Sequence, residues 1–176
     1  MNIATFHYKQ KQDKLVAKLF TRYPILVKLW ARHSKFAEFS DSPWTRMTMP
    51  ASQCRLALVT TGGVHLRSQS PFNMQDPSGD PTFREIPADT SHKNLMITHA
   101  YYDHTDADKD INIVLPLERV LELRYCGDIG DVNHRHFSFM GHIAGQHVQT
   151  LMRDTAPRVA SALKADDVDI VILTPA

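Results

Sequence analysis

Short apolar runs and polar, loop-forming segments alternate along this chain in the manner of an α/β protein. Residues 55–61 (Arg-Leu-Ala-Leu-Val-Thr-Thr) and 168–174 (Val-Asp-Ile-Val-Ile-Leu-Thr) each contain four consecutive apolar residues. This pattern predicts strands that are buried on both faces. Residues 95–98 and 136–140 are shorter strand candidates.

Apolar residues at helical spacing predict the remaining regular elements. Two short amphipathic helices are expected at residues 10–22 and 24–38, and Pro24 is a residue that the first turn of a helix tolerates. A third helix, at residues 113–124, has Pro116 in its first turn and Gly127 just beyond its end. A fourth spans residues 146–164 and is kinked or divided at Pro157.

The order of these elements predicts an α/β fold with a mainly parallel sheet flanked by helices. Residues 1–42 form a basic helical extension, and residues 43–176 form the α/β domain. Within that domain residues 67–92 are rich in Pro, Asp, Ser and Gly, so no regular element is expected there. Apolar residues in this segment, such as Phe72 and Ile86, favour a long ordered loop.

Polar and glycine residues follow the predicted strands, where an open α/β sheet places its ligand crevice. Gly62 and Gly63 follow the first strand, and we expect either backbone N–H groups that face a ligand or a simple strand-exit turn. His65 comes next and could take part in chemistry or cap a turn. The loops after the strands, including 99–110, 138–141 and 174–175, are predicted to converge on one edge of the sheet.

The densest polar cluster runs from His99 to Asn112. His99 with Asp103 and His104 resembles part of the zinc motif of metallo-β-lactamase-like hydrolases, but tyrosines stand where another histidine is needed. We therefore predict no metal here and favour a loop entering a helix, with Thr105 or Asp106 as its N-cap. A metal-dependent hydrolase that uses the three residues remains the alternative.

Composition narrows the class of protein further. The 176 residues are 43% hydrophobic and 22% charged, with two cysteines, as expected of a soluble cytoplasmic domain without a disulfide framework. No apolar run is long enough to cross a membrane. Residues 1–40 carry a net charge of +6 and the remainder −5. This favours docking of the basic segment on an acidic body or partner over binding to nucleic acid or a membrane.

A series of short blocks is more specific than any single motif. The blocks are 43–45 (Pro-Trp-Thr), 58–65 (Leu-Val-Thr-Thr-Gly-Gly-Val-His), 71–72 (Pro-Phe), 79–87 (Gly-Asp-Pro-Thr-Phe-Arg-Glu-Ile-Pro), 103–108 (Asp-His-Thr-Asp-Ala-Asp), 110–112 (Asp-Ile-Asn), 115–119 (Leu-Pro-Leu-Glu-Arg) and 137–141 (Phe-Ser-Phe-Met-Gly). Together they resemble the selenoprotein B family, the B component of glycine/sarcosine/betaine reductases and of D-proline reductase. The resemblance covers residues 43–176.

The resemblance implies a reductase component that cleaves a C–N bond of an amino acid or related amine by thiol/disulfide chemistry. In that family a selenocysteine or cysteine, with a cysteine three positions later, follows the final strand and opens a helix. A helix N-terminus stabilises a thiolate or selenolate, which can attack a substrate while the second cysteine resolves the adduct.

This sequence departs from the family pattern at that motif. Cys54 and Cys126 are not in a Cys-x-x-Cys arrangement, and the sequence stops at Ala176, where the redox residue would come next. We expect a truncation at a selenocysteine codon, which the next codons of the gene would test. No bound cofactor is expected on the chain itself.

The resemblance also suggests roles for particular residues. His65, Asp103 and His104 are predicted to act in catalysis by positioning substrate or moving protons. Gly62, Gly63, Arg84 and His99 are predicted to bind the substrate, with Arg84 suited to a carboxylate. The expected partners are other reductase subunits and a second copy of the chain. The alternative to an enzyme component is a non-catalytic binding subunit or folded remnant.

Overall fold

The computed structural model describes residues 12, 15–33 and 45–176, and the chain divides into two compact units. The smaller unit holds residues 1–48 and 100–103, and the larger holds residues 49–99 and 104–176. In the smaller unit residues 15–22 are helical and α2 spans Pro24–His33, so Pro24 begins a helix as predicted. The predicted parts at residues 10–11, 13–14 and 34–38 lie outside the described residues. None of the described helices is long and apolar enough to cross a membrane.

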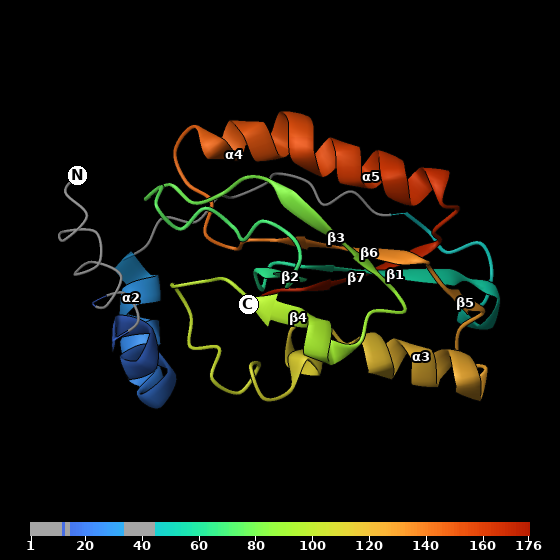
Figure 1. Ribbon diagram of the computed structural model, residues 1–176, viewed down its shortest axis with the longest axis horizontal. Helices are drawn as coiled ribbons and strands as arrows, with labels where there is room; N and C mark the ends of the chain where they lie inside the picture. The colour runs from blue at the N-terminus through green and yellow to red at the C-terminus, as the bar shows by residue number, and fades with distance from the viewer. Residues whose placement is uncertain (1–11, 13–14, 34–44) are drawn as a thin grey trace. The chain divides into compact units, whose positions relative to one another are not determined.

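The larger unit is built around β1 (Arg55–Thr60), the central strand of its main sheet (Figure 1). β7 (Ile170–Thr174) pairs in parallel with β1 from Leu56 to Thr60. β5 (Asp131–Val132) and β6 (Arg135–Phe139) pair in parallel with the opposite side of β1, and β3 (Phe83–Pro87) lies antiparallel beside β6. The predicted α/β fold with a mainly parallel sheet is confirmed.

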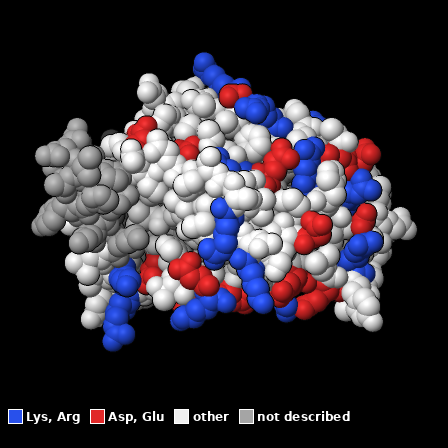
Figure 2. All heavy atoms as spheres, viewed as in Figure 1, with Lys and Arg blue, Asp and Glu red and all other residues white. Residues whose placement is uncertain are grey.

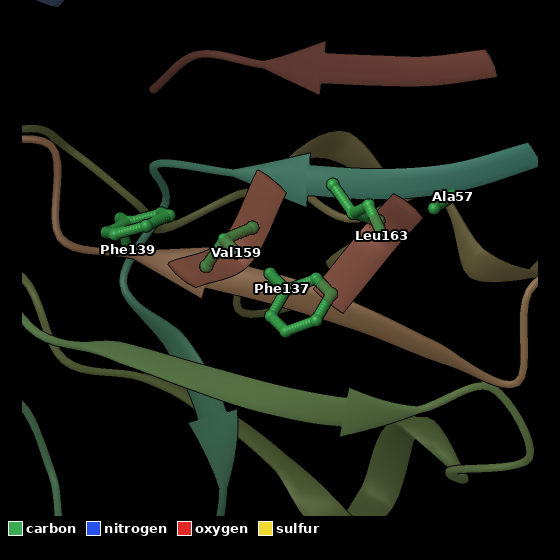
Figure 3. Close-up of a cluster of buried hydrophobic side chains, with 5 residues drawn as sticks. All are labelled: Ala57, Phe137, Phe139, Val159 and Leu163. Atoms are coloured by element: carbon green, nitrogen blue, oxygen red, sulfur yellow. The ribbon is translucent and has the colours of Figure 1, made fainter. Parts of the chain in front are cut away.

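Helices cover both faces of this sheet (Figure 1). One face carries α4 (His147–Thr150), a π-helical turn (Leu151–Thr155) and α5 (Ala156–Ala165), and the other carries α3 (Leu117–Cys126). Figure 3 shows how α5 closes the core: Val159 and Leu163 point toward Phe137 and Phe139 of β6. The π-helical turn ends just before Pro157, so the predicted irregularity of this helix is confirmed.

A histidine ring completes the ladder between β1 and its neighbours. β1 pairs with β5 through Leu56 and Val132, and with β6 through Val59 and Phe137. The segment from β5 to β6 has two more residues between these paired positions than β1 has. The Leu58 N–H donates to Nδ1 of His136 at 3.0 Å, in place of a strand carbonyl. Since Nδ1 accepts, the proton of the neutral ring is on Nε2. His136 is fully buried, and burial lowers its pKa to about 4.

Two strands differ from the sequence-based expectation. The segment at residues 67–92 contains β3, which we did not predict because the segment is rich in Pro, Asp, Ser and Gly. Pro87 is the last residue of β3, and an edge strand tolerates such a proline. The predicted strand at 95–98 exists as β4 (Leu95–Ile97), but it does not join the parallel sheet. It pairs antiparallel with β2 (Val64–Leu66) in a separate two-stranded sheet, so His65 belongs to a strand.

Two predicted element boundaries were also wrong. Asp110, rather than Thr105 or Asp106, is an N-cap: its side chain accepts from Asn112 N–H at the start of the 3₁₀ turn Ile111–Ile113. α3 begins only at Leu117, after Pro116, and ends as predicted at Gly127, whose φ of 78° is left-handed.

The final strand is less buried than its apolar sequence predicts. β1 is the one described strand that pairs with β7, so β7 forms an edge of the sheet. Val171 is 39% exposed and Leu173 is 71% exposed. Burial on both faces, which we predicted for this strand, is therefore wrong.

Candidate functional site

The carboxyl ends of β1, β6 and β7 are tied together at one edge of the sheet. Thr61 N–H donates to the Thr174 carbonyl at 3.1 Å, and Thr61 Oγ1 accepts from Ala176 N–H at 3.1 Å. Gly63 N–H donates to the carbonyl of Phe139, the last residue of β6, at 2.9 Å. The predicted convergence is confirmed for the loops after β1, β6 and β7, and this carboxyl edge is the natural place for a ligand. The loop at 99–110 follows β4, which is not a strand of this sheet.

Gly62 and Gly63 allow three segments to approach closely at this edge. A Cβ on Gly62 would lie 3.0 Å from Val114 Cβ, and a Cβ on Gly63 would lie 2.6 Å from the Thr98 carbonyl oxygen. The Gly62 N–H donates to Thr60 Oγ1 at 3.0 Å, and the Gly63 N–H is also bonded within the chain, as described above. The expectation of N–H groups that face a ligand is therefore wrong, and a substrate-binding role for the two glycines stays a prediction.

Gly63→Ala should lower the free energy of unfolding by about 2 kcal/mol more than Gly127→Ala. Both positions have a positive φ, 69° and 78°, so the conformational penalty of a side chain is similar. Only Gly63 adds a collision, because nothing lies within 4 Å of a Cβ on Gly127. Urea unfolding of both variants measures the difference, and equal losses would contradict the close approach at Gly63.

His65 is a buried histidine with both ring nitrogens engaged. Nδ1 lies 2.8 Å from the Leu66 carbonyl oxygen, and Nε2 lies 2.8 Å from Thr98 Oγ1. The side chain is 1% exposed, and burial lowers its pKa. These contacts link β2 to the end of β4. Proton transfer to a substrate would require one of them to break, so the predicted catalytic role of His65 stays a prediction.

His99 lies beside Gly63 at the carboxyl edge. A Cβ on Gly63 would be 3.3 Å from His99 Cβ. His99 is 6% exposed, and its pKa is lowered to about 4 by burial and by the nearby His142 and His104. The imidazole is therefore neutral at pH 7, a state in which it can hydrogen-bond a substrate without adding charge. Its predicted role in substrate binding stays a prediction.

His104 faces an open cavity of about 560 Å³, which we call the β4 cleft. Its Nδ1 is 2.8 Å from Asp108 Oδ2, and both residues line the cleft. An imidazole oriented by a carboxylate can accept and return a proton. Asp103, the other predicted catalytic residue of this segment, belongs to the smaller unit, whereas all the residues that line the cleft belong to the larger unit.

Arg84 holds the loop that precedes β3. Its guanidinium donates to the carbonyls of Ser70 at 2.8 Å and Pro71 at 3.1 Å, and lies 4.4 Å from the centre of the Phe72 ring. Asp80 Oδ2, at 3.8 Å, is the carboxylate of its ion pair. These contacts confirm an ordered loop. The predicted binding of a substrate carboxylate by Arg84 stays a prediction, and it would have to compete with them.

The two cysteines lie at the opposite edge of the sheet. The Cys54 carbonyl accepts from Gly130 N–H at 3.0 Å, next to the amino end of β5. Cys126 is exposed at the end of α3, which the Arg124–Asp131 ion pair of 3.2 Å fixes near the same end of β5. Cys54 is buried, and burial together with the charge of Asp169 raises the pKa of its thiol. Neither thiol is placed to react at the carboxyl edge.

The described residues include no cluster of three or more His, Cys, Asp or Glu side chains that could hold a metal ion. The hydrolase alternative therefore has no ligand set in this part of the chain.

Sequence reasoning missed several polar groups that build the edge and the cleft. From the sequence we interpreted Thr61 and Thr174 only as the ends of strands. A hydroxyl residue directly after an apolar run was the signal that could have identified them as polar groups of the edge. The Thr174 hydroxyl donates to the Val114 carbonyl at 2.7 Å. Arg67 and Lys93 also line the β4 cleft, although 26 residues separate them in the chain.

Comparison with known proteins places this fold in a family. The family model described as glycine/sarcosine/betaine reductase selenoprotein B (GRDB) matches residues 34–176. The D-proline reductase subunit gamma of Acetoanaerobium sticklandii is 36% identical over 131 residues, which are 74% of this chain and 52% of that protein. No solved structure matches this chain significantly.

Two glycine reductase complex component B gamma subunits are also similar. The protein of Symbiobacterium thermophilum is 30% identical and that of Carboxydothermus hydrogenoformans 29% identical, in each case over 70% of this chain and 28% of the relative. The chain thus spans about half of the first relative and less than a third of these two. The match to the family model covers most of the sequence, and the chain belongs to the glycine/sarcosine/betaine reductase selenoprotein B family.

Proposed function

We propose that this chain is a component of a multi-subunit reductase that acts on an amino acid or related amine by reductive C–N bond cleavage. The family match over residues 34–176 carries this proposal. The fold supports it, because three strand ends meet at one carboxyl edge where a small molecule can be held. The three relatives are named as subunits of D-proline reductase and glycine reductase, so the partners proposed are other subunits of such a complex.

The proposal assigns the reacting thiol or selenol to a residue other than Cys54 and Cys126. Both lie at the amino edge of the strands, and Cys54 is buried with a raised thiol pKa. A buried neutral thiol is a poor nucleophile. The chain then supplies the scaffold and polar side chains around the carboxyl edge, and a selenocysteine or cysteine pair supplies the two electrons and forms the adduct.

Within this scheme His104, oriented by Asp108, moves the proton that the leaving amine requires. His65 is proposed to assist in catalysis, and Gly62, Gly63, His99 and Arg84 to bind the substrate. Asp103 belongs to the smaller unit, and its predicted catalytic role stays a separate proposal. A cytoplasmic complex fits the reducing conditions that thiol chemistry needs. The exposed Val171 and Leu173 of β7 support contact with a second copy of the chain or with a further subunit.

Reconstitution with the other reductase subunits tests the proposal, with the chain extended through the expected selenocysteine or cysteine pair. We expect dithiol-dependent consumption of one substrate among D-proline, glycine, sarcosine and betaine. His104→Gln should lower the rate at least tenfold, within the range of general acid–base catalysis. His134→Gln, at an exposed position outside the cleft, is the matched control and should retain the rate. Equal rates for the two variants would remove His104 from the scheme, and no activity on any substrate would contradict the function.

A further inference from the structure

β4 has a second edge, which faces the β4 cleft. Leu95, Met96 and Ile97 all line this cavity, although neighbouring side chains of a strand point to opposite faces. A cavity that touches all three residues therefore lies along an edge of the strand. β2 occupies the other edge, so the cavity runs beside the edge that β2 leaves open.

The hydrogen-bond pattern places main-chain groups of β4 toward this cavity. Thr98 N–H donates to the Gly63 carbonyl at 2.9 Å, and Arg67 N–H donates to the Asn94 carbonyl at 2.8 Å. Along an antiparallel pair, every second residue turns its N–H and C=O groups toward the partner strand and the residues between turn theirs away. The N–H and C=O groups of Leu95 and Ile97 therefore point away from β2. The Leu95 N–H is capped by the His92 carbonyl, which leaves the Leu95 C=O and both groups of Ile97 facing the cleft.

The rim of the cleft is positively charged. Arg67, Lys93 and Lys109 line it, with Asp108 as the acidic residue among the lining side chains. Lys109 pairs with Asp106 at 2.8 Å. Figure 2 shows lysine and arginine side chains gathered over β4 on this face, with a few acidic side chains beside them.

Two of the rim cations are available to a ligand. Arg67 Nε donates to the Lys93 carbonyl at 2.9 Å, which fixes the guanidinium at the strand edge. Within the described residues its two terminal amino groups have no protein partner, and neither does the Lys93 ammonium. A guanidinium fork held in this way suits a carboxylate.

We propose that the β4 cleft binds an extended acidic peptide segment of a partner protein, which adds to β4 as a strand. Main-chain groups of the segment pair with Ile97 and the Leu95 carbonyl, and its acidic side chains reach Arg67 and Lys93. Strand addition at an open edge gives affinity through the main chain, and charge complementarity selects the partner. The inference goes beyond the proposed function, because it assigns a docking site to this chain. His104 and Asp108 line the same cleft, so a docked segment would lie beside the pair to which the proposed function gives proton transfer.

Fluorescence anisotropy with a labelled peptide of alternating Glu and Val tests the proposal on the full chain. We expect saturable binding that weakens with added salt. A Lys/Val peptide should not bind, and the Glu/Val peptide with N-methylated main-chain amides should bind at least tenfold more weakly. Hydrogen exchange of the Ile97 amide should slow when the unmodified peptide is bound.

Charge-reversal variants locate the site. Arg67→Glu combined with Lys93→Glu should weaken binding at least tenfold. Arg153→Glu combined with Lys164→Glu makes the same charge change on the helices that cover the other side of the sheet, and should leave binding unchanged. Equal losses in the two double variants would overturn the site.

The competing outcomes are equally clear. If the N-methylated peptide binds as well as the parent, or if succinate or inorganic phosphate displaces the peptide at matched concentration, the strand proposal is overturned in favour of a simple anion site. Absence of any peptide binding also overturns it. Peptide binding is measured without the other reductase subunits, so these results leave the proposed function untouched.

Discussion

Lowering the pH from 7 to 5 should reduce the free energy of unfolding by about 4 kcal/mol through His99 and His136, because these buried histidines must stay neutral in the folded chain. Burial also lowers the pKa of His65, which adds to the loss in the same direction. The pKa of His99 and of His136 is about 4, against 6.5 for an ordinary histidine. A lowered folded-state pKa means that the unfolded chain binds more protons below pH 6.5. Stability is therefore full above pH 6.5 and falls as the pH approaches 4, by about 2 kcal/mol for each histidine at pH 5.

Urea unfolding at pH 7, 6 and 5 measures this dependence. His136→Gln should reduce the loss between pH 7 and 5 by about half, even though it also lowers stability at pH 7 by removing the acceptor for the Leu58 N–H. His134→Gln, at an exposed position, should change the dependence much less than His136→Gln, because the charge of His134 is only the smaller cause of the lowered His136 pKa. A free energy of unfolding that stays constant from pH 7 to 5 would show that these rings are not buried neutral groups.

Arg135→Met should lower the free energy of unfolding by about 3 kcal/mol, because it removes the cation from a largely buried carboxylate and leaves it with the Asn133 Nδ2 donor at 3.0 Å. Arg135 donates from Nε and Nη2 to the two oxygens of Asp166 at 2.8 and 2.9 Å, and from Nη1 to Glu85 at 3.1 Å. The Asp166 side chain is 8% exposed. This bidentate contact joins β6 and β3 to the residue that caps α5, so its loss loosens several elements together.

The contact between Arg135 and Asp166 should also make the free energy of unfolding depend on pH. Hydrogen bonds from Arg135 lower the pKa of Asp166 to about 2, from an ordinary 3.8. The stabilisation is thus present above pH 3.8 and is lost as the pH falls toward 2.

The matched control is Arg119→Met, which removes an exposed pair with Glu122 and should change stability by less than about 0.5 kcal/mol. If Arg135→Met is no more destabilising than this control, the contact does not hold the sheet together.

The main sheet could be predicted because its strands carry strong local signals. β1 has four consecutive apolar residues, and both of its faces are covered. β3 was missed because its alternation is short and lies in a segment rich in Pro, Asp, Ser and Gly, and β2 because three residues are too few for a periodic pattern. β7 looked like a doubly buried strand since its apolar run resembles that of β1; which strand lies at an edge depends on tertiary pairing and not on the run itself.

The candidate site was predictable in location but not in detail. The glycines after β1 and the polar residues after β6 and β7 marked the carboxyl edge. The N–H groups of both glycines are bonded within the chain, to Thr60 Oγ1 and to the Phe139 carbonyl. The glycine pair alone does not predict these bonds. The capture of the Leu58 N–H by the His136 ring joins residues 78 apart, and no local pattern indicates such a contact.

We propose that this chain serves a reductase through the carboxyl edge of its sheet, while its own two cysteines take no part in the chemistry. The most direct measurement is the dithiol-dependent rate of the reconstituted complex that carries the Cys54→Ala and Cys126→Ala substitutions together. We predict a rate within about twofold of the unmodified complex, since both positions lie at the opposite edge of the strands. A rate that falls to background, with the variant still folded and assembled, would contradict the claim.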